Sequence, residues 1–512
     1  MALFSILFQS PDRAIGGEPP GAPAFFRDLN LDQVVNVLTL GWKEYDLAPF
    51  YYSPLSDLDS ITYRQEVMQD LEIESLVEAV QSFSGRMRDM RKCLSKVKEL
   101  HYKYALERWF LIAVETYVDA VKHLSLALRS NDVRSHGLCG FREYLDGYTS
   151  CEAFQELATE TEVLRSNLSS IHYSVLLRDG GVTVGRYDGE MDYSAVVEET
   201  FEKFRDTATT TGHRLSPHNS PGMNHVQAQV LDRLALLYPE PFGALDNFYS
   251  SHQDYLDPTV ARFDREIHFY IAYLAYIEKM RHAGLRFCLP QLSQIAKEVK
   301  CRDGFDLALA HKLIAQRATV VTNDFYLSAP ERILVVSGPN QGGKTTFARM
   351  FGQMQYLASL GCPVPGTDVH LFLFDQMFTH FEREENITNL RGKLQDDLVR
   401  IRDILESATP RSVIVMNEMF SSTTVKDALY LSKKVMTSIS DLDTLCVWVT
   451  FLDELASFNE KTVSMVSTVN PDNPAVRTYK LQRKPADGLA YALAIAHKYR
   501  VTYGYLKERI KA

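Results

Sequence analysis

The stretch Gly338-Pro339-Asn340-Gln341-Gly342-Gly343-Lys344-Thr345 decides the fold of this 512-residue chain. It directly follows the apolar run Ile333-Leu334-Val335-Val336 and precedes the helix-forming residues Phe347-Ala348-Arg349-Met350. Glycines at both ends let the backbone curl so that successive N–H groups and the next helix start point at phosphate groups. The pattern therefore predicts a strand, a phosphate-binding loop and a helix, with ATP or a similar nucleotide as ligand.

Two side chains of this loop have the chemistry that a nucleotide requires. Lys344 is long enough to reach the terminal phosphates, and the hydroxyl of Thr345 can bind Mg²⁺. The predicted cofactors are therefore ATP and Mg²⁺. The predicted nucleotide-binding residues of the loop are Gly338, Pro339, Asn340, Gln341, Gly342, Gly343, Lys344, Thr345 and Thr346.

A second apolar run ends in residues that complete an ATPase site. Val413-Ile414-Val415-Met416 is followed by Asn417 and Glu418. Phosphate-loop ATPases usually place an Asp at the first position, in the Mg²⁺ shell, and a Glu at the second, where it orients the attacking water. Glu418 is therefore the candidate catalytic base. Asn417 can contact a metal-bound water or Thr345, but it lacks the negative charge, so we expect weaker Mg²⁺ binding and slower turnover.

Composition predicts a globular protein without a membrane span. Hydrophobic residues make up 46% and charged residues 23% of the chain, and no unbroken apolar stretch reaches the length of a bilayer. The run Ala2-Leu3-Phe4-Ser5-Ile6-Leu7-Phe8 is short and lacks a basic leader, which argues against a secretory signal. Seven scattered cysteines without a CxxC pair indicate reduced thiols. We therefore expect a cytoplasmic protein.

The charge balance limits how the chain could contact nucleic acid. A formal charge of −10 and a pI near 5.8 give no global attraction to phosphate backbones. DNA contacts must then come from local basic surface or from enclosure of the DNA. A basic run on one predicted helix is compatible with a solvated face and with a DNA contact. Its members are Arg86, Arg88, Arg91, Lys92, Lys96, Lys98 and Lys103.

Length alone suggests about three or four structural units. Composition and the spacing of apolar residues divide the chain into three regions. Residues 1–50 form an N-terminal arm whose Gly- and Pro-rich stretch at 16–23 predicts flexibility, with a short helix near Leu31–Leu40. Residues 51–299 are mostly helical, since apolar residues recur at three- and four-residue steps from Met90 to Leu128 and from Val260 to Ala283. Residues 300–512 alternate short apolar runs with helical segments, as in an α/β nucleotide-binding domain.

An insertion at about 170–225 interrupts the helical region. Tyr173–Val184 predicts a β-hairpin, because two alternating apolar runs flank Asp179-Gly180-Gly181. Thr207–His225 is rich in Thr, Ser, Pro and Gly and predicts a polar loop.

These motifs resemble the MutS family of DNA mismatch-repair ATPases. The loop at 338–346 is similar to the family's Gly-Pro-Asn followed by Gly-Gly-Lys-Ser-Thr. The run at 417–427 falls on the family's Asp-Glu-x-Gly-Arg-Gly-Thr-Ser-Thr-x-Asp segment. Glu418, Thr423 and Asp427 match that segment, whereas Asn417, Phe420, Ser421 and Ser422 differ.

Three further positions follow from the resemblance. Asn323 stands where the family has an Asn before the loop, which makes it a predicted nucleotide-binding residue, while Val320 stands where an adenine-stacking Phe is common. Phe451, in Thr450-Phe451-Leu452-Asp453-Glu454-Leu455, replaces a His thought to position water. Together with Asn417, this replacement predicts slow hydrolysis.

The resemblance extends from about Tyr51 to the C-terminus, because Tyr51–Val67 and Arg281–Pro290 look like the start and the end of the family's helical core. It implies an α/β P-loop (ABC-type) ATPase domain joined to a mostly α-helical core and lever domain with a small β-hairpin insertion. It also implies a truncated member, without the N-terminal mismatch-reading and connector domains.

Family members dimerise, so the resemblance implies a homodimer in which a Ser-containing loop of the partner completes each ATP site. Residues 385–397 correspond to that loop, with Gly392 in place of the Ser. A contact in trans would then come from backbone N–H groups, Arg391 or Lys393, and a plain loop with exposed charges fits equally well.

The function that the resemblance implies is an ATP-dependent DNA-binding clamp in mismatch repair or related DNA repair or recombination. ATP binding and hydrolysis would drive dimer closure, with structure-dependent DNA and other repair factors as partners. Two alternatives stay open on the sequence: a ribosome- or RNA-directed ATPase switch, and a regulatory module that binds ATP with little hydrolysis.

Overall fold

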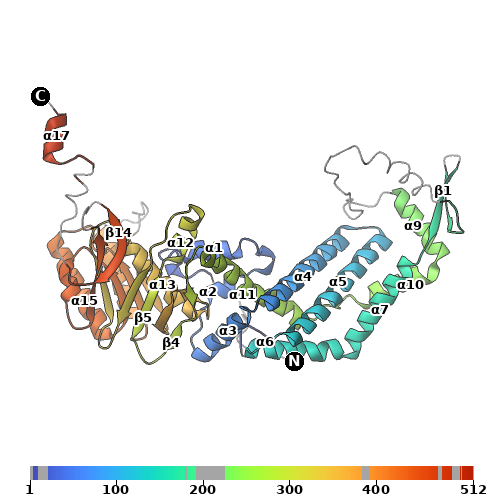
Figure 1. Ribbon diagram of the computed structural model, residues 1–512, viewed down its shortest axis with the longest axis horizontal. Coiled ribbons are helices and arrows are strands. Elements are labelled where there is room, and N and C mark those ends of the chain that lie inside the picture. The colour runs from blue at the N-terminus through green and yellow to red at the C-terminus, as the bar shows by residue number, and fades with distance from the viewer. Residues whose placement is uncertain are drawn as a thin grey trace. The chain divides into compact units, whose positions relative to one another are not determined.

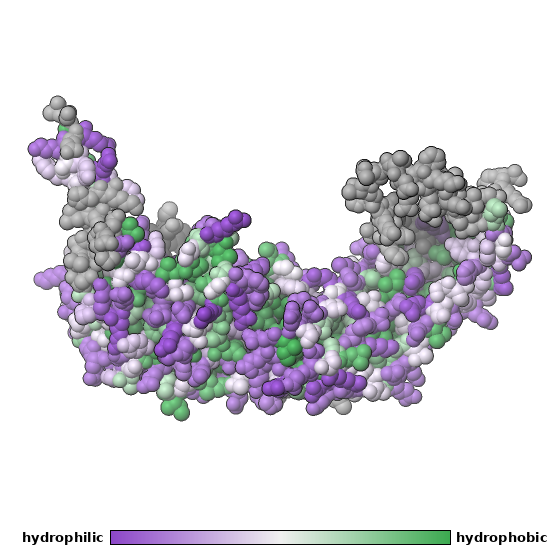
Figure 2. Space-filling view, in the orientation of Figure 1, coloured by the Kyte–Doolittle hydropathy of each residue, from purple (hydrophilic) through white to green (hydrophobic). Residues whose placement is uncertain are grey.

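The computed structural model describes residues 4–9, 21–178, 181–191, 225–382, 392–470, 476–486, 496 and 499–510. The chain divides into two compact units, fewer than the three or four that length suggests. The first unit takes in Met1–Leu71, Arg134–Gly137 and Arg265–Ala512, and the second Glu72–Val133 and Leu138–Asp264. Hydrophilic residues cover much of the face seen in Figure 2. No helix in the described ranges is both long and apolar enough to cross a bilayer.

A six-stranded sheet forms the core of the first unit, with β14 labelled in Figure 1. The strand order is β10-β11-β12-β7-β13-β14. Five strands run parallel, and β14 pairs antiparallel with β13. Every residue of the central strands β7, β11 and β12 is buried, as expected of parallel strands covered on both faces. The strand bounds are β7 (Ile333–Ser337), β10 (Met377–His380), β11 (Val413–Asn417), β12 (Leu445–Val449), β13 (Thr462–Val469) and β14 (Arg477–Arg483).

Three helices follow strands of this sheet: α13 (Lys344–Ser359), α14 (Lys393–Ser407) and α15 (Val425–Leu442). Apolar residues of α14 and α15 share one core cluster with the sheet, in which Trp448 is 1% exposed. The apolar runs Ile333–Val336 and Val413–Met416, together with a third run at Leu445–Thr450 that also predicts a core strand, are confirmed as β7, β11 and β12.

A second sheet of the first unit has the order β4-β9-β5-β6. Its strands are β4 (Gln291–Ser293), β5 (Val299–Gly304), β6 (Asn323–Leu327) and β9 (Asp368–Phe372). Between β5 and β6 lies α12 (Leu307–Ala315), which begins at the N-cap Asp306. The short strands β3 (Phe287–Cys288) and β8 (Val364–Pro365) pair with each other.

Helices of the N-terminal region complete the first unit. They are α1 (Leu31–Thr39), α2 (Ala48–Tyr52) and α3 (Leu58–Asp70), with 3-10 turns at Ala24–Phe26 and Lys43–Tyr45. A further 3-10 turn, Asp453–Ser457, lies between β12 and β13. Near the C-terminus lies α17 (Tyr503–Arg509). The helix predicted near Leu31–Leu40 is confirmed. Phe4–Phe8 lies in the interior of the unit, whereas the predicted flexible stretch lies outside the described residues up to position 20.

The second unit is built on a pair of long helices that pack against each other, α4 (Glu74–Glu99) and α5 (Lys103–Ser130). The helical pattern from Met90 to Leu128 is therefore interrupted at Leu100, which leaves the helical region with ψ 139°. The interruption lets the two apolar stripes bury each other, which one continuous helix could not do. The other helices of this unit are α6 (His136–Ser150), α7 (Glu152–Ser169), α9 (His225–Leu237) and α10 (Pro239–Ser251). The helix α11 (Pro258–His282) begins in the second unit and belongs to the first unit from Arg265 on.

Two more predictions for the helical region are confirmed. The periodicity from Val260 to Ala283 corresponds to α11. The predicted hairpin consists of β1 (Tyr173–Arg178) and β2 (Gly181–Arg186), which pair antiparallel with Val175 opposite Val184. The predicted polar loop Thr207–His225 lies outside the described residues except for His225.

Candidate functional site

The phosphate loop joins β7 to α13 within the first unit, in the strand–loop–helix order that the sequence predicts. Gly338 has φ +112° and Gly343 has φ +92°, values that other residues rarely adopt. A Cβ on Gly338 would also lie 3.0 Å from the carbonyl oxygen of Ser467. Glycine is therefore required at this position by both backbone conformation and space.

Ser467 of β13 holds the loop from the neighbouring strand. It is completely buried, and its hydroxyl donates a 2.6 Å hydrogen bond to the carbonyl oxygen of Gly342. The strand β13 pairs directly with β7, which leads into the loop. This pairing places Ser467 beside Gly342. Ser467 thus fixes the loop at Gly342 and leaves no room for a side chain at Gly338.

Lys344 is 4% exposed and is held at the loop by three oxygen atoms. Its ammonium group donates to the carbonyl oxygens of Gly338 (3.0 Å) and Pro339 (3.3 Å) and to Oδ1 of Asn340 (3.2 Å). Burial lowers the pKa of Lys344, and the carboxylate of Glu418, 3.9 Å from Nζ, opposes that shift. The cation therefore lies where phosphate oxygens would need it.

The end of β11 meets the start of α13. The hydroxyl of Thr345 donates a 2.9 Å hydrogen bond to Oδ1 of Asn417. Glu418 follows with φ +51°, and its backbone N–H donates to the carbonyl oxygen of Val449 on β12. Its carboxylate remains one-third exposed. The structure thus brings together Lys344, Thr345, Asn417 and Glu418 from two strand ends.

A cavity of about 590 Å³ opens beside these residues. The phosphate loop lines one part, and apolar residues of α12 and the segment before β6 line another. Of the predicted site residues, Gly338, Pro339 and Asn417 are not in its wall, although each touches Lys344 or Thr345 through a hydrogen bond. The lining residues are Asp306, Leu309, Leu313, Thr319, Val320, Val321, Asn323, Asn340, Gln341, Gly342, Gly343, Lys344, Thr345, Thr346, Glu418 and Tyr479.

Asn323 lines this cavity, but its amide bonds to β14. Nδ2 donates to the carbonyl oxygen of Tyr479 (3.1 Å), and Oδ1 accepts from the backbone N–H of Leu481 (2.7 Å). The amide therefore fixes β14 beside the loop. Its predicted contact with a nucleotide stays a prediction.

Tyr479 and Arg477 of β14 are site residues that sequence reasoning missed. Tyr479 is half exposed and lines the cavity that Val320 also lines. Arg477 donates from Nε to the carbonyl oxygen of Asn340 at 3.2 Å. Neither belongs to a recognisable motif, and both follow the loop by more than 130 positions, so local spacing gives no signal for them.

The residues after β12 lie outside the cavity wall. Thr450 is buried; its backbone N–H donates to the carbonyl oxygen of Val336, and its hydroxyl oxygen accepts from the N–H of Leu452. Phe451 is 46% exposed. A phenyl ring has no donor with which to position water, and the slow hydrolysis expected from this replacement stays a prediction.

The stretch predicted to act in trans lies outside the described residues from position 383 to 391. Gly392 is the N-cap of α14, and Lys393 forms an ion pair with Glu382 of the same chain. A role for this stretch in a partner's site stays a prediction.

Several members of the basic run, on α4 and at the start of α5, form ion pairs or a cation–π contact with other residues of the second unit. Arg91 pairs with the buried Asp264, and Lys103 pairs with Asp246 at 2.9 Å. Lys96 lies 3.9 Å from the ring centroid of Trp109. These cations stabilise helix packing, which reduces the charge they could offer to DNA.

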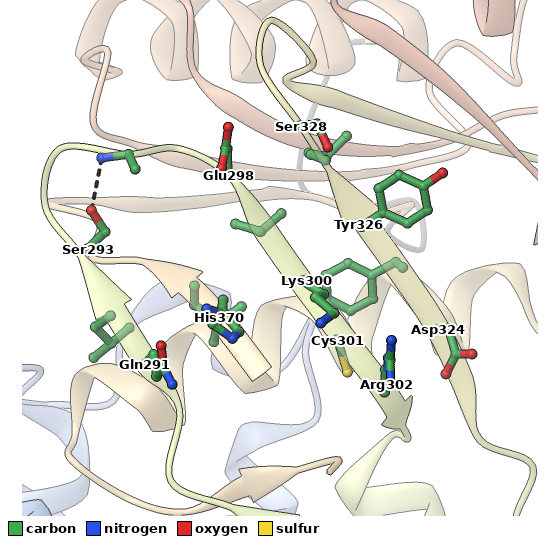
Figure 3. Close-up of a pocket in the computed structure, with 16 residues that line it drawn as sticks. Gln291, Ser293, Glu298, Lys300, Cys301, Arg302, Asp324, Tyr326, Ser328 and His370 are labelled. Carbon is green, nitrogen blue, oxygen red and sulfur yellow. Dashed lines mark hydrogen bonds between the residues drawn. The ribbon is translucent and has the colours of Figure 1, made fainter. Parts of the chain in front are cut away.

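A second cavity, of about 670 Å³, is larger but lies away from the phosphate loop, on the sheet β4-β9-β5-β6 (Figure 3). Lys300, Arg302 and His370 all face it, and all three contact Asp368. The carboxylate offsets the positive charge. Since no phosphate-binding backbone accompanies them, the smaller cavity is the better candidate site.

Comparison with known proteins agrees with this choice. Residues 334–503 match the family model of MutS domain V. This range begins on β7 and contains the loop, Asn417, Glu418 and β14. The match does not include the upstream helical part, whose resemblance to the family core stays a prediction.

The chain is also similar to proteins named DNA mismatch repair protein MutS. It is 26% identical over 183 residues to the protein of Geobacillus sp. (strain WCH70), which covers 35% of this chain and 21% of the relative. With the protein of Erythrobacter litoralis (strain HTCC2594) it shares 30% identity over 181 residues, 34% of this chain and 20% of the relative. The DNA mismatch repair protein MSH3 of Kluyveromyces lactis is 23% identical over 186 residues, 36% of this chain and 18% of the relative. The matched region thus spans about a fifth of each relative.

Proposed function

This chain is a member of the MutS family, and from that premise we propose that it is an ATP-dependent DNA-binding protein of DNA mismatch repair or related DNA repair or recombination. ATP binding and hydrolysis at the cavity beside the phosphate loop would drive closure of a homodimeric clamp. The observation that carries the proposal is the meeting of Lys344, Thr345, Asn417 and Glu418 inside the matched domain.

The shape and lining of the cavity suit ATP. The loop from Asn340 to Thr346 offers backbone N–H groups and the Lys344 cation to a triphosphate. Leu309, Leu313 and Val320 offer apolar contacts to a base. Tyr479 supplies an aromatic face in the same cavity, so base stacking does not depend on an aromatic residue at position 320.

The oxygen atoms of Thr345 and Asn417 fit a hard cation such as Mg²⁺. We propose that Thr345 contacts the metal and that Asn417 acts through a metal-bound water. The metal, when bound, would neutralise charge on the phosphate oxygens. Because Asn417 carries no charge, the protein itself contributes little to holding the metal.

Glu418 is the proposed base that orients the attacking water. Its carboxylate lines the cavity and is close enough to Lys344 for their charges to interact. An exposed Phe451 and a neutral Asn417 remove two groups that would assist this step. The proposal therefore includes slow turnover.

Residues 300–512 would form a P-loop ATPase domain of the ABC type, residues 51–299 the helical core and lever, and residues 1–50 an N-terminal arm. DNA would be recognised by its structure, because the chain is acidic and Arg91 and Lys103 of the basic run are paired with carboxylates of the second unit. Other repair factors are proposed partners.

ATP turnover by the purified protein tests the proposal. It is measured without DNA and with homoduplex, mismatched or branched DNA, for the unchanged protein, Glu418→Gln, and Glu460→Gln as a matched control on an exposed carboxylate. We expect slow turnover, stimulated by one DNA form, lost in Glu418→Gln and kept in the control. Absence of any ATP binding would contradict the proposal, and binding without Glu418-dependent turnover would refute its hydrolytic part.

A further inference from the structure

The segment Phe4–Phe8 is bonded by side chains of α3 and α11 in the first unit, and the surface that these side chains form is here called the groove. Ser5, Ile6 and Leu7 are 3%, 1% and 0% exposed, and Phe8 is 8% exposed. An apolar run at the start of a chain buries this completely only where the surrounding structure is shaped to receive it. The groove is formed by side chains of α3 and α11.

The groove contacts the segment through its backbone. The hydroxyls of Tyr63 and Tyr270 donate to the carbonyl oxygens of Ser5 (2.7 Å) and Ile6 (2.6 Å). Nε of Arg64 donates to the next carbonyl oxygen, that of Leu7, at 3.0 Å. Three consecutive carbonyls are thus each matched by a buried donor, an arrangement typical of a peptide-binding site.

A buried acid contacts the same segment. Glu266 of α11 is 3% exposed, and both of its carboxylate oxygens accept from the hydroxyl of Ser5 at 2.9 Å. One of them also accepts from the backbone N–H of Ile6 at 2.8 Å. The groove therefore distinguishes a small hydroxyl side chain at the second position of the segment from an apolar one.

Arg64 links this groove to the helix that begins at the phosphate loop. It is completely buried, and its Nη1 donates to the carbonyl oxygen of Leu360, the C-cap of α13, at 3.1 Å. Its guanidinium also lies 5.1 Å from the ring centroid of Phe8. One cation thus contacts the segment and the far end of the nucleotide-site helix.

Removing the segment would leave Arg64 and Glu266 without several of their bonds in a buried environment, which is costly for charged groups. The surroundings cannot simply close, because Gly361 already lies so near Arg64 that a Cβ on it would be 2.7 Å from the Cβ of Arg64. Loss of the segment must therefore change the packing around the end of α13.

We propose that Phe4–Phe8 is an internal peptide ligand whose occupancy of this groove sets the nucleotide affinity through Arg64 and α13. The ligand class is an apolar peptide with Ser at its second position, bent so that the backbone N–H groups of Leu7 and Phe8 donate to the hydroxyl of Ser5. The inference rests on the proposed function only for the nucleotide part, since the link from the groove to α13 exists without it.

The test removes the segment from the groove by a substitution and then supplies the segment as a separate peptide. Leu7→Asp in the full chain places a charge at a completely buried position, and a synthetic peptide of residues 1–9 is then added. Backbone amide exchange over α13 is followed without nucleotide, and affinity is followed with a fluorescent ATP analogue. We expect faster exchange at the end of α13, about tenfold weaker nucleotide binding, and recovery of both with peptide.

Matched variants separate this coupling from general instability. Asp443→Asn removes a carboxylate bonded to Lys297, Arg332 and Lys461 and should lower stability without weakening nucleotide binding. Should Leu7→Asp not fold, Arg64→Lys is used in its place. It keeps the positive charge but lacks Nε and Nη1, the two donors to the carbonyl oxygens of Leu7 and Leu360. It should also loosen α13 and weaken binding.

Unchanged exchange over α13 after displacement, or unchanged affinity with a displaced segment, would overturn the inference. Failure of the unchanged protein to bind ATP would instead contradict the proposed function. In that case the exchange measurement, which needs no nucleotide, still decides whether the segment controls α13.

Discussion

The hydroxyl of Thr345 and the side-chain oxygen of Asn417 lie 2.9 Å apart, and this hydrogen bond joins the start of α13 to the end of β11. Both atoms are neutral, although they lie where a divalent cation would be held. The usual carboxylate is replaced by an amide of nearly the same shape. The charge at this position, more than the geometry, therefore distinguishes this site from the sites of phosphate-loop ATPases.

Restoring the carboxylate should strengthen metal binding. For Asn417→Asp we expect the Mg²⁺ concentration that half-saturates ATP binding to fall about tenfold, because a charge is added beside the cation. A Mg²⁺ titration of fluorescent-nucleotide binding measures this. Asn36→Asp adds the same charge on the exposed face of α1 and should have no effect. An unchanged midpoint in Asn417→Asp would exclude Asn417 from the metal shell.

Tyr479 should contribute to binding of the base. We expect Tyr479→Ala to weaken ATP binding about fivefold, the effect of losing one aromatic stacking contact, and Tyr479→Phe to retain affinity. Equilibrium binding of ATP measures both. Tyr430→Ala, at a 63% exposed position of α15, is the control. Equal affinities of the Ala and Phe variants would show that the ring does not contact the nucleotide.

Glu107 should make the stability of the second unit depend on pH. Burial raises the pKa of this carboxyl to about 7, with Lys103 acting in the opposite direction. The folded state then holds a proton that the unfolded state releases near pH 4.5. The contribution of Glu107 to the free energy of unfolding is therefore largest at low pH and is lost as pH rises through about 7. Thermal unfolding between pH 5 and 8 should show this fall, and Glu107→Gln should flatten it. A profile that is identical in the variant would contradict the assignment.

Asp443 should stabilise the folded state with the opposite pH dependence. Burial favours its neutral form, but hydrogen bonds from Lys461, Lys297 and Arg332 outweigh burial and lower the pKa to about 2. This stabilisation is present above pH 3.8 and is lost as pH falls through about 2. Because the side chain is one-third exposed, we expect Asp443→Asn to cost only about 1 kcal/mol at neutral pH, measured by urea unfolding. No change in unfolding free energy would show that solvent screens these pairs.

The parts of the fold that depend on local pattern could be predicted from the sequence. The phosphate loop, the strands β7, β11 and β12, the helices α1 and α11 and the hairpin β1–β2 each have a continuous signal of periodicity or turn residues. The break between α4 and α5 could not, because the apolar spacing continues through Leu100 and only tertiary packing requires the chain to turn.

The features that could not be predicted depend on contacts between segments that are distant in the sequence. Ser467, Arg477 and Tyr479 reach the site because β13 and β14 add to the sheet beside β7, and strand order is not a local property. The burial of Phe4–Phe8 depends on donors from α3 and α11, which a short apolar run cannot reveal. Likewise, the basic run of α4 gives no indication that Arg91 bonds to Asp264.

Equilibrium binding of ATP to the unchanged protein and to Lys344→Ala tests the central claim most directly. We predict saturable binding by the unchanged protein and at least tenfold weaker binding by the variant, because the variant lacks the buried cation that lies at the phosphate loop beside Glu418. Thermal unfolding of both proteins establishes that the variant is folded under the conditions of the binding measurement. Equal binding by both proteins, or none by either, would contradict the central claim.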